Sequence, residues 1–368
     1  MKKILAIAFL AFLGCTEKES VSVKVIDFEA LEKVSVDLLI EKVIPLETDS
    51  TALLSEYLMV KYDKDDFFVM NYDRPTGIHH FSKEGKYLRM VAEIGEAPGQ
   101  VMGIRNFRLF GDVVQVNSGF GNSLEIHSFT KSGALLNSTP YPINAFSFYP
   151  IDQNELWFYS SYNMVAGDHR LFKANGQGEV LKELLPNDFN EKMLPIDEQS
   201  FFEGDDAVLF RESFKTSVYE LSKGDSLREV YRFDFGATTV PENYWEMDAF
   251  AGFEMISKQG FSNLNFLQET EKYLLADVVT QNESGQKKEL YIWNKSTNKE
   301  FKIVIDEDEQ GYFNSLIGLE GDQLVFISYA PYLVRNSETL NLSPEAKASL
   351  SSVTEDSNPV ILYAKIPE

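Results

Sequence analysis

The feature that most constrains the fold of this 368-residue chain is a turn that recurs at nearly constant intervals. Each copy places an aromatic residue before a short polar turn with a glycine, and a new apolar run follows it. Four copies occur: Phe81–Leu88, Phe129–Leu136, Phe172–Leu181 and Tyr219–Leu227. Their glycines are separated by 48, 45 and 46 residues. A period of this length predicts repeated units that must stack on one another to bury their apolar faces.

The strand pattern inside each repeat indicates the kind of unit. The intervals hold two further short apolar runs each, such as 66–72, and a fifth copy of the turn at Ile292–Phe301 lacks the glycine. Four short strands in about 40–50 residues are typical of a β-propeller blade. When two helical insertions at about 239–259 and 336–358 are set aside, the domain at 41–368 has room for six blades, with seven as the alternative. We therefore predict an all-β, six-bladed β-propeller of four-stranded blades.

The two ends of this domain predict how the ring closes. Residues 41–47 read as a lone strand before the first blade, and Val360–Lys365 reads as a strand that ends the chain. Pairing of these two strands in the last blade would leave no open sheet edge. We expect the N-terminal strand to be the outer strand of the sixth blade.

The two insertions carry helix signals. Thr239–Glu242 has the form of a capping box, and Gly260 follows as a stop signal. Ser343 and Pro344 fit the N-cap and first position of a second short helix. Because the first insertion leads into an innermost strand, we expect its helix, from Pro241 to Ile256, to lie across one end of the axial channel with Tyr244 or Trp245 facing that channel.

The N-terminus has the pattern of a bacterial lipoprotein signal. Two lysines precede an apolar stretch of ten residues, Ile4–Leu13, and Gly14 then precedes Cys15. Ten residues rise only about 15 Å as a helix, about half of a 30 Å hydrocarbon core, so a cleaved signal fits better than a spanning helix. We expect residues 1–14 to be removed, Cys15 to carry lipid, and 15–40 to form a tether leading into the domain. The alternative is an ordinary secretory signal.

Cysteine usage and charge exclude several functions. Cys15 is the only cysteine, so the chain forms no intramolecular disulfide and offers no second thiol for zinc or for catalysis. The formal net charge is −23, so we expect the chain to lack the basic surface that nucleic-acid binding requires. No nucleophile elbow, P-loop, zinc-protease motif or EF-hand loop occurs. No cofactor is therefore evident, and we expect a binding protein more than an enzyme.

Three segments resemble a known group of proteins. Val43–Thr48, Phe81–Lys86 and Ile94–Gln100 are similar to segments of six-bladed β-propeller lipoproteins with NHL-like repeats, which are common in Gram-negative, gut-type bacteria. This chain departs from that group's pattern at two positions, because Ala97 stands where the pattern has a glycine and Gln100 stands where it has an acidic residue. The resemblance implies the fold and an outer-membrane lipoprotein on either the surface or the periplasmic side. It implies no activity.

Polar and aromatic residues near the axis are the candidates for ligand binding. Innermost strands converge on the axial funnel, and flat aromatic faces suit the apolar face of a sugar. The candidates are Tyr244, Trp245, Arg105, Arg108, Asn263 and Asn265. Lys61 and Glu56 are alternative choices for the first blade. We therefore predict a membrane-anchored binding or scaffold module for a glycan, a peptide or an envelope partner protein.

A metal-dependent hydrolase or lyase of the lactonase-like propeller type is the alternative. Enzymes of that kind hold a metal on the axis with oxygen ligands, which suit Ca²⁺ or Mg²⁺. Four residues could imitate such a ligand set: Glu56, Asn106, Asn263 and Asn314. Their spacing is not diagnostic, because polar residues of inner strands commonly only solvate a channel.

Overall fold

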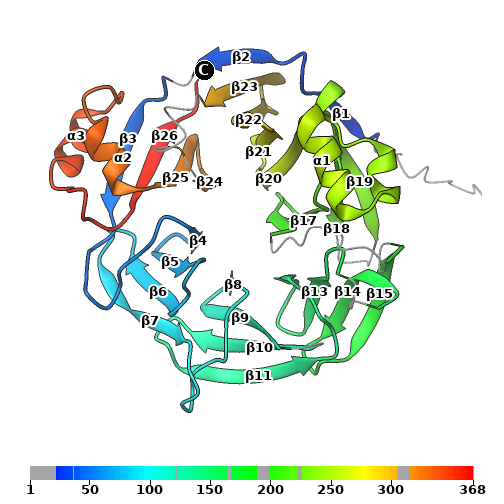
Figure 1. Cartoon of the computed structure of the whole chain (residues 1–368). Coiled ribbons are helices and arrows are strands. Elements are labelled where there is room, and N and C mark those ends of the chain that lie inside the picture. Colours follow the sequence, from blue (N-terminus) through cyan, green and yellow to red (C-terminus); the bar gives the residue numbers. More distant parts are fainter. Residues whose placement is uncertain are drawn as a thin grey trace, which may run out of the picture.

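The computed structural model describes residues 22–35, 37–120, 123–163, 167–188, 199–221, 226–305, 313 and 315–367. The described residues form six sheets arranged as a ring around a central axis (Figure 1). Neighbouring strands within each blade are antiparallel, and the first strand named for each blade below lies nearest the axis. The prediction of a six-bladed β-propeller is confirmed.

The first three blades follow one another directly along the chain. The first blade consists of β4 (Leu58–Tyr62), β5 (Asp66–Asn71), β6 (Gly77–Ser82) and β7 (Tyr87–Glu93). The second consists of β8 (Asn106–Phe110), β9 (Val113–Phe120), β10 (Ser123–Thr130) and β11 (Leu135–Tyr141). The third consists of β12 (Ser147–Pro150), β13 (Glu155–Tyr159), β14 (His169–Asn175) and β15 (Val180–Pro186).

The remaining blades include strands from the N-terminal part of the chain. The fourth consists of β16 (Phe201–Glu203), β17 (Val208–Arg211), β18 (Ser217–Leu221) and β19 (Leu227–Asp234). The fifth consists of β20 (Phe261–Glu269), β21 (Tyr273–Asn282), β22 (Gly285–Asn294) and β23 (Lys299–Ile305). The sixth consists of β24 (Ser315–Glu320), β25 (Gln323–Ser328), β26 (Val360–Lys365) and β3 (Ile40–Pro45).

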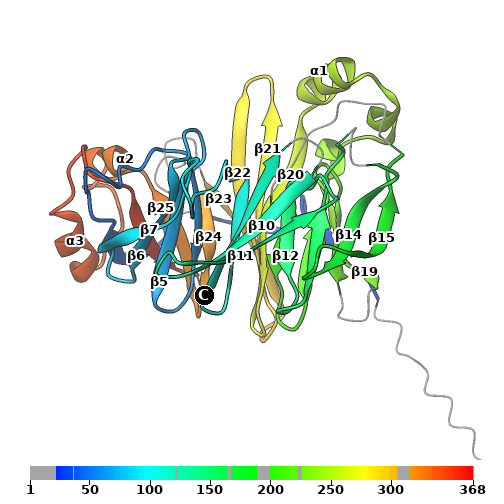
Figure 2. The ribbon, with the colours of Figure 1, turned by 90° about the horizontal axis from the view of Figure 1, so that it is seen from below.

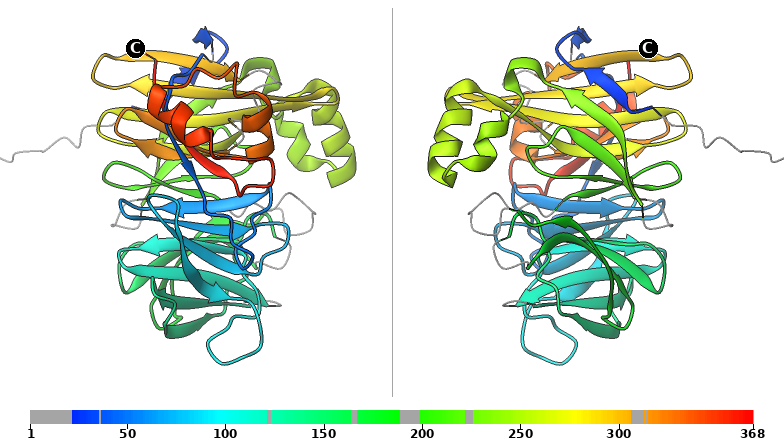
Figure 3. Two further views of the ribbon diagram at one scale, coloured as in Figure 1. Left: turned by 90° about the vertical axis from the view of Figure 1, so that its left-hand side faces the viewer. Right: turned by 90° about the vertical axis from the view of Figure 1, so that its right-hand side faces the viewer.

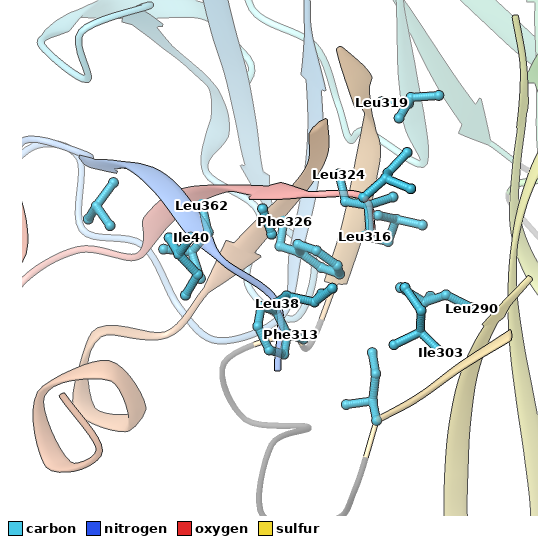
Figure 4. Close-up of a cluster of buried hydrophobic side chains, with 14 of the residues drawn as sticks. Leu38, Ile40, Leu290, Ile303, Phe313, Leu316, Leu319, Leu324, Phe326 and Leu362 are labelled. Carbon is cyan, nitrogen blue, oxygen red and sulfur yellow. The ribbon is translucent and has the colours of Figure 1, made fainter. Parts of the chain in front are cut away.

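The ring closes in the sixth blade as the sequence predicted. Strand β3 pairs antiparallel with β26, so that Val43 lies opposite Leu362 and Pro45 opposite Val360. Each face of the sixth blade shares an apolar core with its neighbour, one with the fifth blade and one with the first. Figure 4 shows one of them, in which Leu38 and Ile40 lie near Phe326 and Phe313. The two ends of the chain are therefore held together by a sheet and by a shared apolar core.

Two strands before the closing strand were not anticipated. Strand β1 (Lys24–Asp27) pairs parallel with β19, and β2 (Glu32–Ser35) pairs parallel with β23. They add a fifth, outermost strand to the fourth and fifth blades. The Lys24 ammonium group lies 2.6 Å from a carboxylate oxygen of Glu300, which ties the first of these strands to the fifth blade. These short strands begin within the segment that the sequence assigned to the tether.

Helices lie in both predicted insertions, which begin a few residues before the predicted bounds of about 239 and 336. Between β19 and β20 lie η1 (Gly236–Thr238), η2 (Glu242–Glu246) and α1 (Ala249–Gln259), and between β25 and β26 lie α2 (Ala330–Arg335) and α3 (Pro344–Leu350). Both insertions leave the sheets on the same side of the ring. We call this side the helical face, and the opposite side, which carries turns such as 63–65 and 204–207, the turn face. Figures 2 and 3 show α1 and the β21–β22 hairpin projecting beyond the ring on the helical face.

The first insertion is not the single helix that the sequence predicted. The Thr239–Glu242 box makes no side-chain cap, because Pro241 is the N-cap of η2. This short helix ends at Glu246, and the backbone of the next residue, Met247, is extended (φ −84°, ψ 161°). The helix that follows is capped by Asp248, whose side chain accepts from the backbone N–H groups of Phe250 and Ala251. The predicted stop at Gly260 and the predicted N-cap at Ser343, which accepts from Ala346 N at 3.1 Å, are both confirmed.

Candidate functional site: the axial channel

Three cavities follow the axis of the ring. Two of them, of about 440 and 480 Å³, open towards the turn face, and the third, of about 260 Å³, lies towards the helical face. Their walls come mainly from the innermost strands of the blades, and residues such as Trp157, Leu221 and Asp277 from strands further out complete them. Lys61 lines all three cavities, so its side chain lies where they meet.

Strand alternation explains the position of Lys61. In β4, Met59 packs with Phe107 in the core between the first and second blades. Lys61 is two residues further along, so its side chain points to the same side, towards the second blade. It is partly exposed to the channel and makes no hydrogen bond or ion pair with the described residues. Burial and the nearby Arg108 lower the pKa of Lys61 to about 7, although Glu203 acts in the opposite direction.

Arg108 is the second cation of the channel, and it is fixed. Its side chain is only 7% exposed. Nε donates to the backbone oxygen of Phe148 at 3.2 Å, and one terminal nitrogen donates to that of Phe201 at 2.7 Å. The side chain therefore reaches from the second blade to the third and the fourth. Burial lowers the pKa of Arg108, but a guanidinium starts so high that it stays charged.

The acidic residues of the two larger cavities lie at their rim. Glu203 ends β16 on the turn face and is exposed, as are Asp205 and Asp206 in the turn that follows. Glu320 lines the neighbouring cavity, but its carboxylate already contacts the Lys83 ammonium and accepts from the Tyr363 hydroxyl at 3.3 Å. In the two larger cavities, Lys61 and Arg108 thus lie further inside than the carboxylates, whereas the third cavity is lined by the ion pair of Lys288 and Asp277.

Two tyrosines complete the wall near these cations. The ring of Tyr149 lies 5.4 Å from the Arg108 guanidinium carbon, and Tyr62 lies against Gly318 of β24. Burial, together with the negative charge of Glu320, raises the pKa of Tyr62 well above its usual value. Its hydroxyl therefore stays neutral and can donate a hydrogen bond at physiological pH.

Comparison with known proteins assigns a family. Residues 23–365 match the family described as "Domain of unknown function (DUF4934)". The chain belongs to the DUF4934 family. No curated protein matches it.

Several solved structures have similar folds. A Bacteroides fragilis NCTC 9343 protein whose name describes it as exported has a TM-score of 0.75 at 14% identity, over 94% of this chain and 100% of that one. A DUF4221 family member from Bacteroides vulgatus ATCC 8482 has a TM-score of 0.56 at 9% identity, over 90% and 98%. Virginiamycin B lyase from Staphylococcus aureus has a TM-score of 0.40 at 13% identity, over 88% and 99%, a likeness too distant to bear on activity. These likenesses show the fold alone.

The predicted ligand residues of the DUF4934 chain divide into two groups. Arg108 and Asn265 line the cavities. Arg105 instead donates to the Asn144 side-chain oxygen at 2.9 Å and stacks on Phe146, and Asn263 accepts from the backbone N–H of Phe214 at 3.0 Å. Arg105 and Asn263 therefore hold loops of the neighbouring blades and do not line these cavities.

The expectation that the first insertion covers the channel is wrong. Figure 1 shows α1 over the ring beside β19 and β20, away from the axis. Tyr244 and Trp245 are 1% and 5% exposed, and their rings lie 5.9 Å from Phe214 and 5.2 Å from Tyr162. Two large rings bury more apolar surface between loops of the third and fourth blades than they would over an open channel. They form a satellite core, and a role for them in ligand binding stays untested.

The residues of the metal-dependent alternative are dispersed among structural contacts. Glu56 accepts from the Tyr332 hydroxyl at 3.3 Å, Asn106 donates to the Phe146 backbone oxygen at 3.3 Å, and Asn263 is engaged as above. Asn314 and Cys15 lie outside the described residues. Within the described part of the chain, no group of three or more His, Cys, Asp or Glu side chains could hold a metal ion. Binding of Ca²⁺ or Mg²⁺ stays a prediction.

Sequence reasoning missed several channel residues. Glu203, Tyr149 and Tyr62 were not candidates, and no residue was assigned to the inner strand of the fourth blade. That strand, β16, has only three residues, too few to show a period of two. Lys61 had a clearer signal, because it is the one charged residue of the run from Leu58 to Tyr62.

Proposed function

We propose that this DUF4934 protein is a binding module, anchored at the outer membrane, that takes part of a ligand into its axial channel. The observation that carries the proposal is the meeting of three cavities at Lys61, beside the fixed Arg108. Volumes of about 440 and 480 Å³ fall within the range of small-molecule sites and suit one or two sugar rings or a peptide end. A whole protein partner would instead require a broad exposed surface.

Binding is favoured over metal-dependent hydrolysis by the state of the channel residues. The side chains expected to hold a metal are engaged with loops. The cavities are lined by cations, phenols and amides as well as by carboxylates, and among the described residues no three of these carboxylates are grouped so that they could hold a metal ion. Such groups orient and hold a polar ligand. We therefore assign recognition to the channel and no chemical step.

The lipoprotein signal and the course of β1 support the anchoring part of the proposal. Lys24, the first residue of β1, lies nine residues beyond Cys15. Fully extended, nine residues span at most about 32 Å. Because β1 runs parallel to β19, the chain approaches from the end of β19 near Leu227, which is on the turn face. A lipid on Cys15 would hold the ring close to the membrane with the turn face towards it. No helix among the described residues is long and apolar enough to cross a membrane.

A ligand screen with a plugged channel tests the proposal. The full-length Cys15→Ala chain would be screened by thermal shift against short glycans and peptides, and hits would be repeated with Ile317→Trp. Ile317 lines two of the cavities, so a larger ring there should fill the channel. Tyr72→Trp is the matched control, because Tyr72 is 45% exposed and lines none of the three. Hits that bind the plugged variant as tightly as the parent contradict channel binding, and so does a screen without hits.

A further inference from the structure

We propose that Lys61 and Arg108 form a site for one oxyanion, so that the channel ligand is a small acidic sugar. This inference rests on the proposed function and specifies its ligand class. The oxyanion would be the carboxylate of a sugar acid or the phosphate of a sugar phosphate, which offer the same acceptor chemistry to the two cations.

The first argument concerns charge balance inside the channel. Lys61 and Arg108 line the same two cavities, and neither contacts a carboxylate of the described residues. Other buried cations of this chain show the contrast: Arg170 lies 2.9 Å from Glu212, and Lys288 lies 3.0 Å from Asp277. Two neighbouring like charges destabilise each other in a confined space, and an anion between them would remove that cost. In a chain with 57 acidic and 34 basic residues, the lack of a carboxylate partner here is a specific arrangement.

The second argument concerns the geometry of Arg108. Two backbone oxygens from two other blades accept from Nε and from one terminal nitrogen. These carbonyls hold the guanidinium without neutralising it. The other terminal nitrogen makes no hydrogen bond with the described residues and remains available to a ligand. A donor that is fixed before the ligand arrives loses little entropy on binding, which favours affinity.

The third argument concerns Lys61, which supplies a mobile second donor. Its four-carbon stem can adjust to the ligand, and its pKa of about 7 means that it is only partly protonated near neutral pH. An oxyanion beside it would favour the protonated form, so binding should take up a proton. The other charged or titratable side chains lining these cavities are, by element, Tyr62 on β4, Asp63 and Lys64 in the turn after it, Tyr149 on β12, Glu203 on β16, Asp205 and Asp206 in the turn after it, Glu320 on β24, Asp277 on β21 and Lys288 on β22.

The rim of the channel limits the ligand to one anionic group. Glu203, Asp205 and Asp206 are exposed around the mouth of the first cavity and repel a polyanion before it can enter. Tyr149 and Phe266 offer ring surfaces within the two larger cavities, against which the apolar face of a sugar ring can pack. A sugar with a single acidic group satisfies both the inner cations and the acidic rim.

Calorimetry with three matched probes tests the site. Glucuronate, glucose 6-phosphate and neutral glucose would be titrated into the full-length Cys15→Ala chain at low salt. We expect at least one charged probe to bind at least tenfold more tightly than glucose, and the stronger of the two identifies the source of the oxyanion. Lys61→Met should weaken that probe at least tenfold, while Lys86→Met, at an exposed turn, should leave it unchanged.

The pH dependence distinguishes a charge contact from a merely structural role. For glucuronate, affinity should fall by up to tenfold per pH unit above pH 7 in the parent chain, and the fall should be absent in Lys61→Arg, whose charge does not titrate there. Arg108→Lys keeps the charge but loses the planar guanidinium and its paired donors, so we expect it to bind glucuronate more weakly than the parent chain does. Should Arg108 variants fail to fold, Lys61→Met still decides, because Lys61 makes no bond with the described residues.

The outcomes separate this inference from the proposed function. Equal affinity for glucose and the charged probes, or full binding by Lys61→Met, overturns the oxyanion site. If neutral glycans or peptides bind the parent and fail to bind Ile317→Trp, the channel is still a ligand site and only the anion assignment falls. If neither charged nor neutral compounds bind, both proposals fall.

Discussion

Tyr62 of the first blade lies so close to Gly318 of the sixth that a Cβ atom at position 318 would be 2.0 Å from the tyrosine hydroxyl oxygen. The two residues meet across the joint between the first and last blades, in the wall of the channel. The absence of a side chain at one position therefore determines where the phenol of the other can lie, beside Glu320 and near Lys61.

Gly318→Ala should displace the Tyr62 ring and destabilise the fold. Overpacking of this kind costs about 1–3 kcal/mol, or a decrease in Tm of a few degrees in a domain of this size. Gly103→Ala is the control, because no atom lies within 4 Å of a Cβ built there. Thermal unfolding of both variants checks the prediction, and equal Tm values for the two would refute the close packing of Tyr62 on Gly318.

Loss of the closing strand should destabilise the whole ring. A chain that begins at residue 51 lacks β3 and leaves the edge of β26 unpaired. We expect its Tm to fall by at least about 5 °C, since about 1 kcal/mol moves Tm by only about 2 °C in domains this large. A chain that begins at residue 37 keeps β3 but lacks β1 and β2, and should lose less. If the chain that begins at residue 51 has the same Tm as the chain that begins at residue 37, the closure argument is wrong.

Tyr244 and Trp245 should behave as core residues. Replacing either with alanine should cost about 3–5 kcal/mol, because each ring is almost fully buried against Phe214 or Tyr162. Phe250→Ala is the matched control on the same insertion, since Phe250 is 79% exposed. Chemical denaturation measures both. Alanine variants of Tyr244 and Trp245 with parental stability would contradict this packing.

Lys61 should make stability depend on pH in a defined direction. Its pKa is about 7 in the folded chain and 10.5 in the unfolded chain, so between these values the unfolded chain binds more protons. Stability should therefore rise with pH across this window, by no more than about 1.4 kcal/mol per pH unit from this group. Urea unfolding at pH 7, 8 and 9, with Lys61→Met as reference, isolates the contribution. If the free energy of unfolding of the parent relative to Lys61→Met stays constant, or falls as pH rises, the low pKa of Lys61 is contradicted.

Anchoring should depend on Cys15 and leave the fold unaffected. Cys15→Ala should move the protein from the membrane fraction to the soluble fraction with an unchanged Tm, because the described fold begins beyond this residue. Ser20→Ala, in the expected tether, is the control. Continued sedimentation of Cys15→Ala with membranes would exclude a lipid on this residue as the anchor.

The repeat and the closing strand could both be predicted, but for different reasons. The repeated turn requires residues that adopt positive φ, and Gly85 and Gly133 have φ values of 84° and 90°. The closing strand could be recognised because a six-bladed ring with one unpaired strand at each end has one way to leave no open edge. Ser343 likewise caps its helix through a contact with a residue three positions away.

The channel could be predicted only in part. Arg105 and Arg108 looked equivalent in the sequence, but Arg105 holds a loop of the third blade and Arg108 lines the cavities. Alternation along a strand defines which side a residue points to and does not define what lies opposite. The same limit explains the misplaced helix around Tyr244 and Trp245, whose burial depends on loops at positions 162 and 214.

The sequence by itself determined the blade, because turn chemistry and strand period act between residues close in the chain. It also predicted six blades, with seven as the alternative, and a closure that leaves no open sheet edge. Only the tertiary structure decided that Lys61 and Arg108 line the same cavities, that Tyr62 rests on Gly318, and that β1 and β2 extend the fourth and fifth blades. The physical reason is that each of these contacts joins residues that are distant in the chain. Their distances are set by the closed ring as a whole, since strand pairing and core packing bring each blade against the next.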